Sequence, residues 1–176
     1  MDTKSRRQQV LQLLKNTKGP VTGSNLAKRF NVSRQIIVGD ISVLRAGGIT
    51  IYATPQGYVL PEEANRDVVV ATITCQHDNA SMLQELETVV DNGGFVRDVI
   101  VEHPLYGEIR ADLMLGSRHD VQEFYNSMLQ CEAKPLSLIT NGVHLHTIEV
   151  PSEAHLQRIR QQLKALGVLA EEQAGI

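Results

Sequence analysis

Residues 141–148 read Asn-Gly-Val-His-Leu-His-Thr-Ile and place His144 and His146 one residue apart. The β-branched and apolar residues around them predict a strand. Because successive side chains of a strand point to opposite faces, both imidazoles point the same way. Such a pair fixes two nitrogen ligands with little freedom left to lose. The pair is therefore a candidate for half of a metal site; a pH switch and a chance cluster of partly exposed histidines are the alternatives.

Two further residues complete a set with metal-binding chemistry. His77 follows a predicted strand at residues 67–75, and Glu85 lies eight residues later in a predicted helix. Three imidazoles and one carboxylate suit Zn²⁺, Fe²⁺ or Ni²⁺, since each neutral imidazole offers one nitrogen and the carboxylate cancels part of the charge of the ion. Cys75 competes with Glu85, because it shares a strand face with His77 and thiolate favours Zn²⁺. Spacing alone leaves both open.

The elements that position these residues follow the order βαββαβ plus a terminal helix. The predicted strands span residues 67–75, 95–102, 108–115 and 143–150, and the predicted helices span residues 81–92, 118–129 and 152–166, the last with Ser152 as its cap. This order predicts an α+β domain on the split-βαβ, ferredoxin-like plan. In such a sheet the first and last strands lie close enough for His77 to meet the His144 pair. The fold alone decides no function, because it hosts many.

The first sixty residues predict a winged helix-turn-helix. Apolar residues recur at helical spacing in three segments, residues 4–16, 24–30 and 34–46, with Thr22 to Ser24 and Ser33 as caps of the second and third. Two short β-rich runs then flank Thr54-Pro-Gln-Gly57, which is a hairpin signal. In this motif the third helix enters the major groove of DNA with its N-terminal residues nearest the bases.

Five residues of this module are candidate DNA contacts. Arg34 and Gln35 lie in the first turn of the third helix, where Arg can bond guanine and Gln can bond adenine in bidentate fashion. The other three, Arg29, Ser33 and Arg45, suit phosphate contacts, which position the protein without reading sequence. The alternative is a small helical domain with ordinary solvated charges.

The charge distribution agrees with a DNA-binding arm. Residues 1–60 hold nine Lys and Arg against two acidic residues, a net charge of +7, whereas residues 61–176 hold eight against eighteen, a net charge of −10. A basic third joined to an acidic remainder predicts two modules, the first of which faces a polyanion. We therefore expect a DNA-binding domain at residues 1–60, a linker at 61–65 and a regulatory domain at 66–176.

Several classes of protein do not fit the composition. No apolar run approaches the roughly 20 residues of a membrane span, and the N-terminus lacks the apolar region of a secretory signal. Two cysteines, Cys75 and Cys131, make no disulfide framework. We expect a cytoplasmic protein without membrane association.

Two groups of motifs carry a resemblance to known families. Residues 21–27 (Val-Thr-Gly-Ser-Asn-Leu-Ala) and 32–37 (Val-Ser-Arg-Gln-Ile-Ile) resemble the winged helix of biotin-repressor-type regulators, which implies operator binding as a dimer on an inverted repeat. The second group looks like the three-histidine (3H) domain: Thr-Cys-Gln-His at 74–77, Leu-Gln-Glu-Leu at 83–86, Val-Glu-His-Pro-Leu-Tyr-Gly-Glu at 101–108, and the run that ends in Gly-Val-His-Leu-His-Thr at 142–147.

Together the two parts resemble the niacin-responsive repressors of NAD biosynthesis and salvage, over about residues 4–167. The resemblance implies a homodimeric repressor of NAD biosynthesis or niacin uptake genes, with nicotinic acid as co-repressor. It also implies that a divalent transition metal, such as nickel, zinc or iron, is held by His77, Glu85, His144 and His146. The resemblance therefore favours Glu85 over Cys75, by analogy.

Nicotinic acid offers a pyridine nitrogen and a carboxylate, either of which can bind the metal. His103, Tyr106 and Arg110 lie in or beside the central hairpin and are candidates to close on the effector, with Arg110 as partner of its carboxylate. The alternative for these three is an ordinary tight turn and a strand arginine.

Two other functions compete with the regulator. One is a metal-dependent, hydrolase-like enzyme fused to a DNA-binding arm, for which Glu102 and Glu108 are the nearby acid/base candidates. The other is a purely structural metal in a dimerisation domain. We expect a regulator with no catalytic residues, because Glu85 is already used as a ligand.

Overall fold

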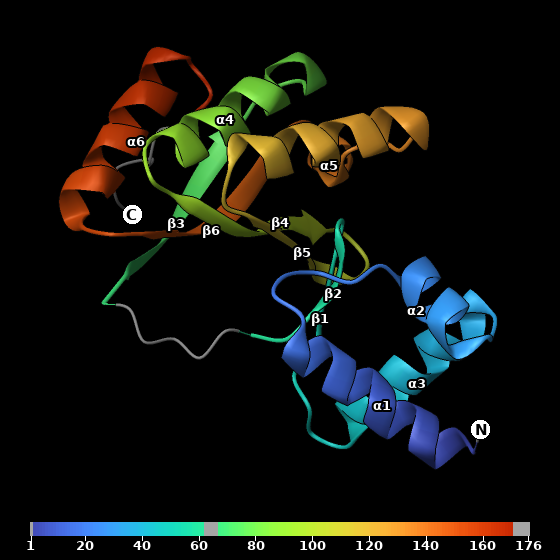
Figure 1. Cartoon of the computed structure of the whole chain (residues 1–176). Coiled ribbons are helices and arrows are strands. Elements are labelled where there is room, and N and C mark those ends of the chain that lie inside the picture. Colours follow the sequence, from blue (N-terminus) through green and yellow to red (C-terminus); the bar gives the residue numbers. More distant parts are fainter. Residues whose placement is uncertain (1, 62–66, 171–176) are drawn as a thin grey trace. The chain divides into compact units, whose positions relative to one another are not determined.

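In the computed structural model, residues 2–61 and residues 67–170 are described, and they form two compact units (Figure 1). Of the predicted linker at 61–65, only Pro61 lies within the described residues. No helix in the described ranges is both long and apolar enough to cross a bilayer.

Three helices build the first unit as the sequence predicts: α1 (Thr3–Asn16), α2 (Gly23–Phe30) and α3 (Arg34–Ala46). The side chain of Thr22 caps α2 by accepting a hydrogen bond from the Asn25 amide, and Ser33 caps α3 by accepting one from the Ile36 amide. Between the two helices, Asn31 adopts the left-handed conformation and closes the short turn. The predicted helix-turn-helix is therefore present.

A small apolar core and one buried ion pair hold the three helices together. The core side chains are Val10, Leu14, Leu26, Ala27, Ile37, Ile41 and Ile51. Asp40 of α3 is also buried, and Arg6 of α1 donates to both of its carboxylate oxygens at 2.6 and 3.3 Å. A buried charge is tolerated when it is paired in this way, so the pair fixes α1 against α3.

The wing is a hairpin of β1 (Tyr52–Thr54) and β2 (Gly57–Val59). Val21, just before α2, bridges to Tyr58 through hydrogen bonds of 2.8 and 2.9 Å. Gly57 lies so close to the Val21 backbone that a Cβ atom would overlap it. The wing is thus attached to the entry of α2.

The second unit is a four-stranded antiparallel sheet with helices on one face. The strands are β3 (Val69–Gln76), β4 (Phe95–His103), β5 (Gly107–Leu115) and β6 (Val143–Val150), and the sheet order is β3-β6-β4-β5. Figure 1 shows α4 (Met82–Asp91), α5 (Arg118–Gln130) and α6 (Glu153–Ala165) on the same side of this sheet. The predicted α+β class, the βαββαβ order and the added helix are confirmed.

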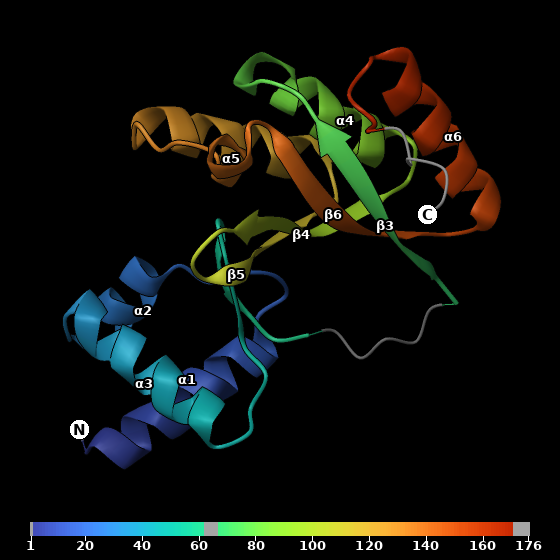
Figure 2. The same ribbon diagram turned by 180° about the vertical axis from the view of Figure 1, so that it is seen from behind.

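The first and last strands are neighbours, and both views show β3 and β6 side by side (Figure 2). Each βαβ unit is split, since β6 lies between β3 and β4, and β4 lies between β5 and β6. After α6 the chain returns along the free edge of β3, where the Gln76 amide donates to Val168 and the Ala170 amide donates to Thr74.

Three local features differ from the sequence prediction. Two short 3₁₀ helices, η1 (Asn79–Ser81) and η2 (Leu136–Thr140), precede α4 and β6. Ser152 lies at the start of α6 as predicted, but its hydroxyl pairs with the His155 imidazole at 2.8 Å and not with a helix amide. Neighbouring side chains therefore compete with the backbone for this cap.

The neighbouring residues Ile36 and Ile37 of α3 allow a matched test of the first core. Ile37 is fully buried, whereas Ile36 is 43% exposed. We expect Ile37→Ala to lower the free energy of unfolding of the first unit by about 2–5 kcal/mol, because a buried cavity remains. The control Ile36→Ala changes it by at most about 0.5 kcal/mol. Hydrogen exchange in urea, resolved by segment, measures both; equal losses would contradict this packing.

Candidate functional site

The structure brings the four predicted metal ligands together. His77 directly follows β3, Glu85 lies in the first turns of α4, and β6 contributes His144 and His146. In the β3–β6 ladder, His144 pairs with Cys75, one strand residue short of the end of β3. The direct pairing of these strands is what places His77 beside the His-x-His pair.

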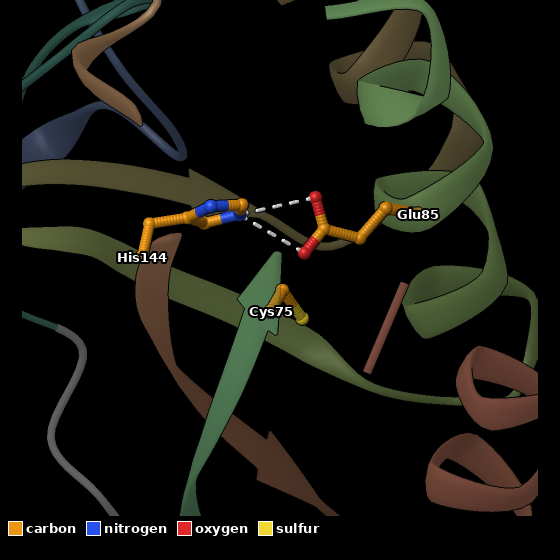
Figure 3. A group of neighbouring side chains, drawn as sticks. All are labelled: Cys75, Glu85 and His144. Carbon is orange, nitrogen blue, oxygen red and sulfur yellow. Dashed lines mark hydrogen bonds and ion pairs between the residues drawn. The ribbon is translucent and has the colours of Figure 1, made fainter. Parts of the chain in front are cut away.

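The Glu85 carboxylate is the centre of the cluster. Its oxygens lie 2.6 Å from Nε2 of His77, 3.2 Å from Nε2 of His144 and 3.4 Å from Nε2 of His146. Figure 3 shows the carboxylate reaching from α4 toward the ring of His144. Glu85 is completely buried, and His144 and His146 are nearly so. A carboxylate in this position requires positive charge around it.

All three imidazoles are oriented by backbone carbonyls. Nδ1 of His77 lies 2.6 Å from the carbonyl oxygen of Asp78, that of His144 lies 2.8 Å from Gly142, and that of His146 lies 2.7 Å from Asp98. A carbonyl only accepts, so each Nδ1 carries the hydrogen and each Nε2 is left to face Glu85. Metal-binding histidines are held in this way in proteins.

When each neutral ring carries its hydrogen on Nδ1, no ring hydrogen is left to bond the Glu85 carboxylate. In neutral rings with Nδ1–H, three Nε2 lone pairs and a carboxylate converge on one point, which is repulsive unless protons or a cation lie between them. Ligand atoms around an ion at about 2.1 Å in tetrahedral or octahedral geometry are about 3.0–3.4 Å apart. The separations between the Glu85 oxygens and the three Nε2 atoms, 2.6–3.4 Å, lie close to this range. The donor set therefore fits a divalent ion.

Protonation is the alternative way to stabilise the cluster. Burial alone would raise the pKa of Glu85, but the charge of His146 and hydrogen bonds from all three rings hold that pKa well below its usual range. Burial would lower the pKa of His77 and of His146, but the Glu85 carboxylate, together with Asp78 at His77 and Asp98 at His146, raises the pKa of both. Protons and a metal ion therefore compete for the same Nε2 atoms.

Cys75 also reaches the cluster. Its sulfur, a Glu85 oxygen and a His144 nitrogen lie within 4.8 Å of one another (Figure 3). Burial, followed by the charge and the hydrogen bond of Glu85, raises the pKa of the Cys75 thiol far above its usual range. The thiol therefore keeps its proton when no ion is bound.

The three predicted effector contacts lie in different places. His103 ends β4 and Tyr106 lies in the turn that leads to β5, where Nδ1 of His103 accepts hydrogen bonds from the amides of Leu105 and Tyr106 at 3.1 and 3.2 Å. The two rings lie side by side, 4.9 Å apart between centroids. Since Nδ1 of His103 is occupied as an acceptor, its Nε2 carries the hydrogen and is a donor.

Arg110 is not brought to the histidine cluster. It pairs with Ile100, and Ile100 pairs with Leu145, which lies between the two histidines of β6. Directly paired residues share a face and successive residues alternate, so Arg110 points away from the imidazoles. Its guanidinium instead bonds Asp98 at 2.7 Å and Glu108 at 3.2 Å. His103, two residues beyond the inward-facing Val101, stays on the side of the cluster.

The predicted DNA contacts fall into two groups. Arg29, Arg34 and Gln35 are exposed on α2 and on the first turn of α3, and Ser33 is exposed as the cap of α3. Arg45 differs, because its guanidinium donates to the carbonyl oxygen of Ile51 at 2.6 and 2.8 Å. These bonds join the end of α3 to the segment that leads into the wing.

Asp98 and Gly142 are parts of the site that the sequence reasoning missed. Both orient histidines through their carbonyl oxygens. An acidic residue within the apolar run Val-Arg-Asp-Val-Ile-Val, and an Asn-Gly pair before the His-x-His strand, are the signals that point to them.

Comparison with known proteins covers both units. Residues 6–59 match the model of an HTH domain, and residues 70–172 match that of the 3H domain. The probable transcription repressor NiaR of Thermotoga maritima is 44% identical over 167 residues, 95% of this chain and 94% of that protein. The transcription repressor NadR of Bacillus subtilis is 42% identical over 170 residues, 96% of this chain and 94% of that protein.

Gly142 provides a test of how the cluster is positioned. Its φ is +88°, and a Cβ atom there would overlap the carbonyl oxygen of His77. Gly107, with φ of +71° and open space around it, is the matched control. We expect Gly107→Ala to cost about 1–2 kcal/mol of unfolding free energy, from backbone strain alone. Gly142→Ala costs more in urea denaturation, and it weakens Co²⁺ binding because His77 must move. Equal losses with unchanged Co²⁺ affinity would show that Gly142 has no such role.

Proposed function

Because the chain belongs to the family of transcription repressors that join a winged helix-turn-helix to a 3H domain, we propose that it represses genes of NAD biosynthesis or niacin uptake. Nicotinic acid is the co-repressor in this proposal, and it is sensed at a divalent metal ion in the second unit. The prediction of a DNA-binding repressor from this family is confirmed by the two relatives and by both domain matches. The effector, the metal and the genes belong to the proposal.

One observation carries the metal site. Three imidazoles, each held by a carbonyl at Nδ1, direct Nε2 at the buried Glu85 carboxylate. Such a set of oriented acceptors is stabilised by a cation of the Zn²⁺, Ni²⁺ or Fe²⁺ class. When bound, the ion supplies open coordination positions for the pyridine nitrogen or carboxylate of nicotinic acid.

Among the residues around the turn, His103 and Tyr106 are the effector contacts that we propose. Nε2 of His103 carries a hydrogen that can bond a carboxylate, and the neighbouring Tyr106 ring is 74% exposed and offers a flat surface to a pyridine. Arg110 is left out, because it lies on the opposite face of the sheet.

At the first unit, we propose that Arg34 and Gln35 read base edges, and that Arg29 and Ser33 contact phosphate. Arg45 then acts on the geometry of the wing, with its guanidinium held by Ile51. A homodimer in the cytoplasm would present two α3 helices to an inverted repeat. Nicotinic acid acts as co-repressor if it binds more tightly to the dimer geometry that matches the operator.

The enzyme alternative gains no acid/base partner from Glu102 or Glu108. The two acids that the sequence suggested, Glu102 and Glu108, pair directly across β4 and β5. Glu102 is next to the inward-facing Val101 and therefore points to the other face of the sheet, together with Arg110. The named relatives are transcription repressors, so the chain is a regulator, and we propose that nicotinic acid leaves the site unchanged.

His144→Ala tests the link between metal and repression. We expect the unmodified protein to bind a selected operator duplex about tenfold or more tightly when nicotinic acid is added, within the usual range of allosteric coupling. A chelator removes this effect. The variant keeps weak, salt-sensitive DNA binding but shows no tightening, because one metal ligand is missing. Titrations at fixed salt, with elemental analysis of each protein, measure the effect.

His119→Ala is the matched control, since His119 is an exposed histidine of α5. It keeps both the metal content and the response. A His144→Ala protein that still tightened on the operator with nicotinic acid would show that the metal link is wrong. Recovery of chemically changed nicotinic acid would favour the enzyme.

Gln35 and Arg29 test the DNA-reading surface, with operator duplexes selected by this protein from randomised DNA. We expect Gln35→Ala to lose about 1–3 kcal/mol of operator binding with little loss on random DNA, because it removes a base contact. Arg29→Ala weakens binding to both duplexes and reduces the slope of log affinity against log salt by about one. If Gln35→Ala weakened both duplexes equally, Gln35 would not be a base reader.

A further inference from the structure

Asp98 occupies an unusual position in the second unit. It lies in the middle of β4 with only 4% of its surface exposed. The strand around it is irregular: from Val96 to Ile100, β4 advances four residues while its partner β6 advances three, from Ile148 to Leu145. One extra residue is therefore accommodated in β4 beside Asp98. Bulges of this kind often redirect a group toward a functional site.

The backbone carbonyl and both carboxylate oxygens of Asp98 accept hydrogen bonds from the neighbouring strands β5 and β6. Its carbonyl oxygen accepts from Nδ1 of His146 at 2.7 Å. One carboxylate oxygen accepts from the Thr147 amide at 2.9 Å, and the other accepts from Arg110 at 2.7 Å. Asp98 thus forms hydrogen bonds both with the imidazole of His146 and with the backbone amide of the next residue of β6.

From these contacts, which rest on the proposed metal centre, we propose that Asp98 and Arg110 are positioning residues for the metal ligand His146. The Asp98 carboxylate fixes the bulged backbone against Thr147, so that the carbonyl of the same residue faces Nδ1 of His146. The Nδ1–H tautomer follows, and Nε2 is left for the ion.

Arg110 holds this arrangement from the outer face of the sheet. Its side chain is 48% exposed, whereas that of Asp98 is 5% exposed. The pair therefore joins a buried carboxylate to a solvent-facing cation on the neighbouring strand β5. Through this pair, the charge of Arg110 influences the orientation of the His146 ring, although Arg110 lies on the face of the sheet opposite the proposed metal ligands. This accounts for Arg110 without requiring it to touch the effector.

Co²⁺ titration of the full chain tests the proposal through the visible absorption of the bound ion. We expect Asp98→Asn and Arg110→Ala to weaken Co²⁺ binding about tenfold and to change the ligand-field spectrum, as changes beside a metal ligand do. Arg110→Lys restores part of the affinity because it returns the charge. The control is Arg97→Ala, which removes another arginine of the same sheet: Arg97 is 36% exposed and pairs across β4 and β6 with Glu149 at 3.2 Å, and Glu149 is itself 30% exposed. This variant stays within about twofold of the unmodified protein.

A readout without metal separates positioning from general stability. In ¹H–¹⁵N spectra of the metal-free protein at alkaline pH, where the ring is neutral, His146 is expected as the Nδ1–H tautomer, and Asp98→Asn is expected to give a mixture. Unchanged Co²⁺ affinity and an unchanged tautomer in both Asp98→Asn and Arg110→Ala would overturn the assignment. If the unmodified protein bound no Co²⁺, the metal centre itself would be wrong, and this inference with it.

Discussion

The second unit depends on one buried carboxylate. Glu85 has no exposed surface and is surrounded by three imidazole nitrogens on backbone-held rings. An isolated ionised carboxylate in such a place would be very unfavourable, so the fold must supply cations, protons or a metal ion there. These nitrogens come from the residue after β3 and from β6, which are paired neighbours in the sheet. The stability of the domain therefore depends on the charge that lies among these atoms.

The sheet order makes this convergence possible. Because β6 lies between β3 and β4, its inward side chains contact both the end of β3 and the irregular part of β4. The carbonyls that orient the rings come from three separate segments: the residue after His77, the turn before β6 and the bulge of β4. A change in any of these segments reaches the cluster through a backbone atom rather than through a new side-chain contact.

Much of the fold and the members of the cluster followed from local patterns in the sequence. Helical spacing and caps located α1, α2 and α3, and the His-x-His alternation placed two rings on one face. The choice between Cys75 and Glu85 did not follow, because residue spacing does not tell which side chains of a helix face the histidines of the sheet. The face of the sheet on which Arg110 lies did not follow either, because it depends on the register across three strands, which the bulges shift. The carbonyl partners of the rings are backbone atoms, so the sequence marks them only indirectly, as the acid in the apolar run does for Asp98.

The bond between Arg45 and the Ile51 carbonyl has a consequence for how the first unit meets a duplex. The end of α3 is bonded to the segment before β1, and Val21 is bonded to Tyr58 of β2, so the wing is attached to the helices at two places. Little conformational freedom then remains to be lost on docking, which lowers the entropic cost of association. The distance between α3 and the wing is then set before the protein meets DNA. A duplex whose groove width does not match this distance is bound less tightly, because it must be deformed to fit.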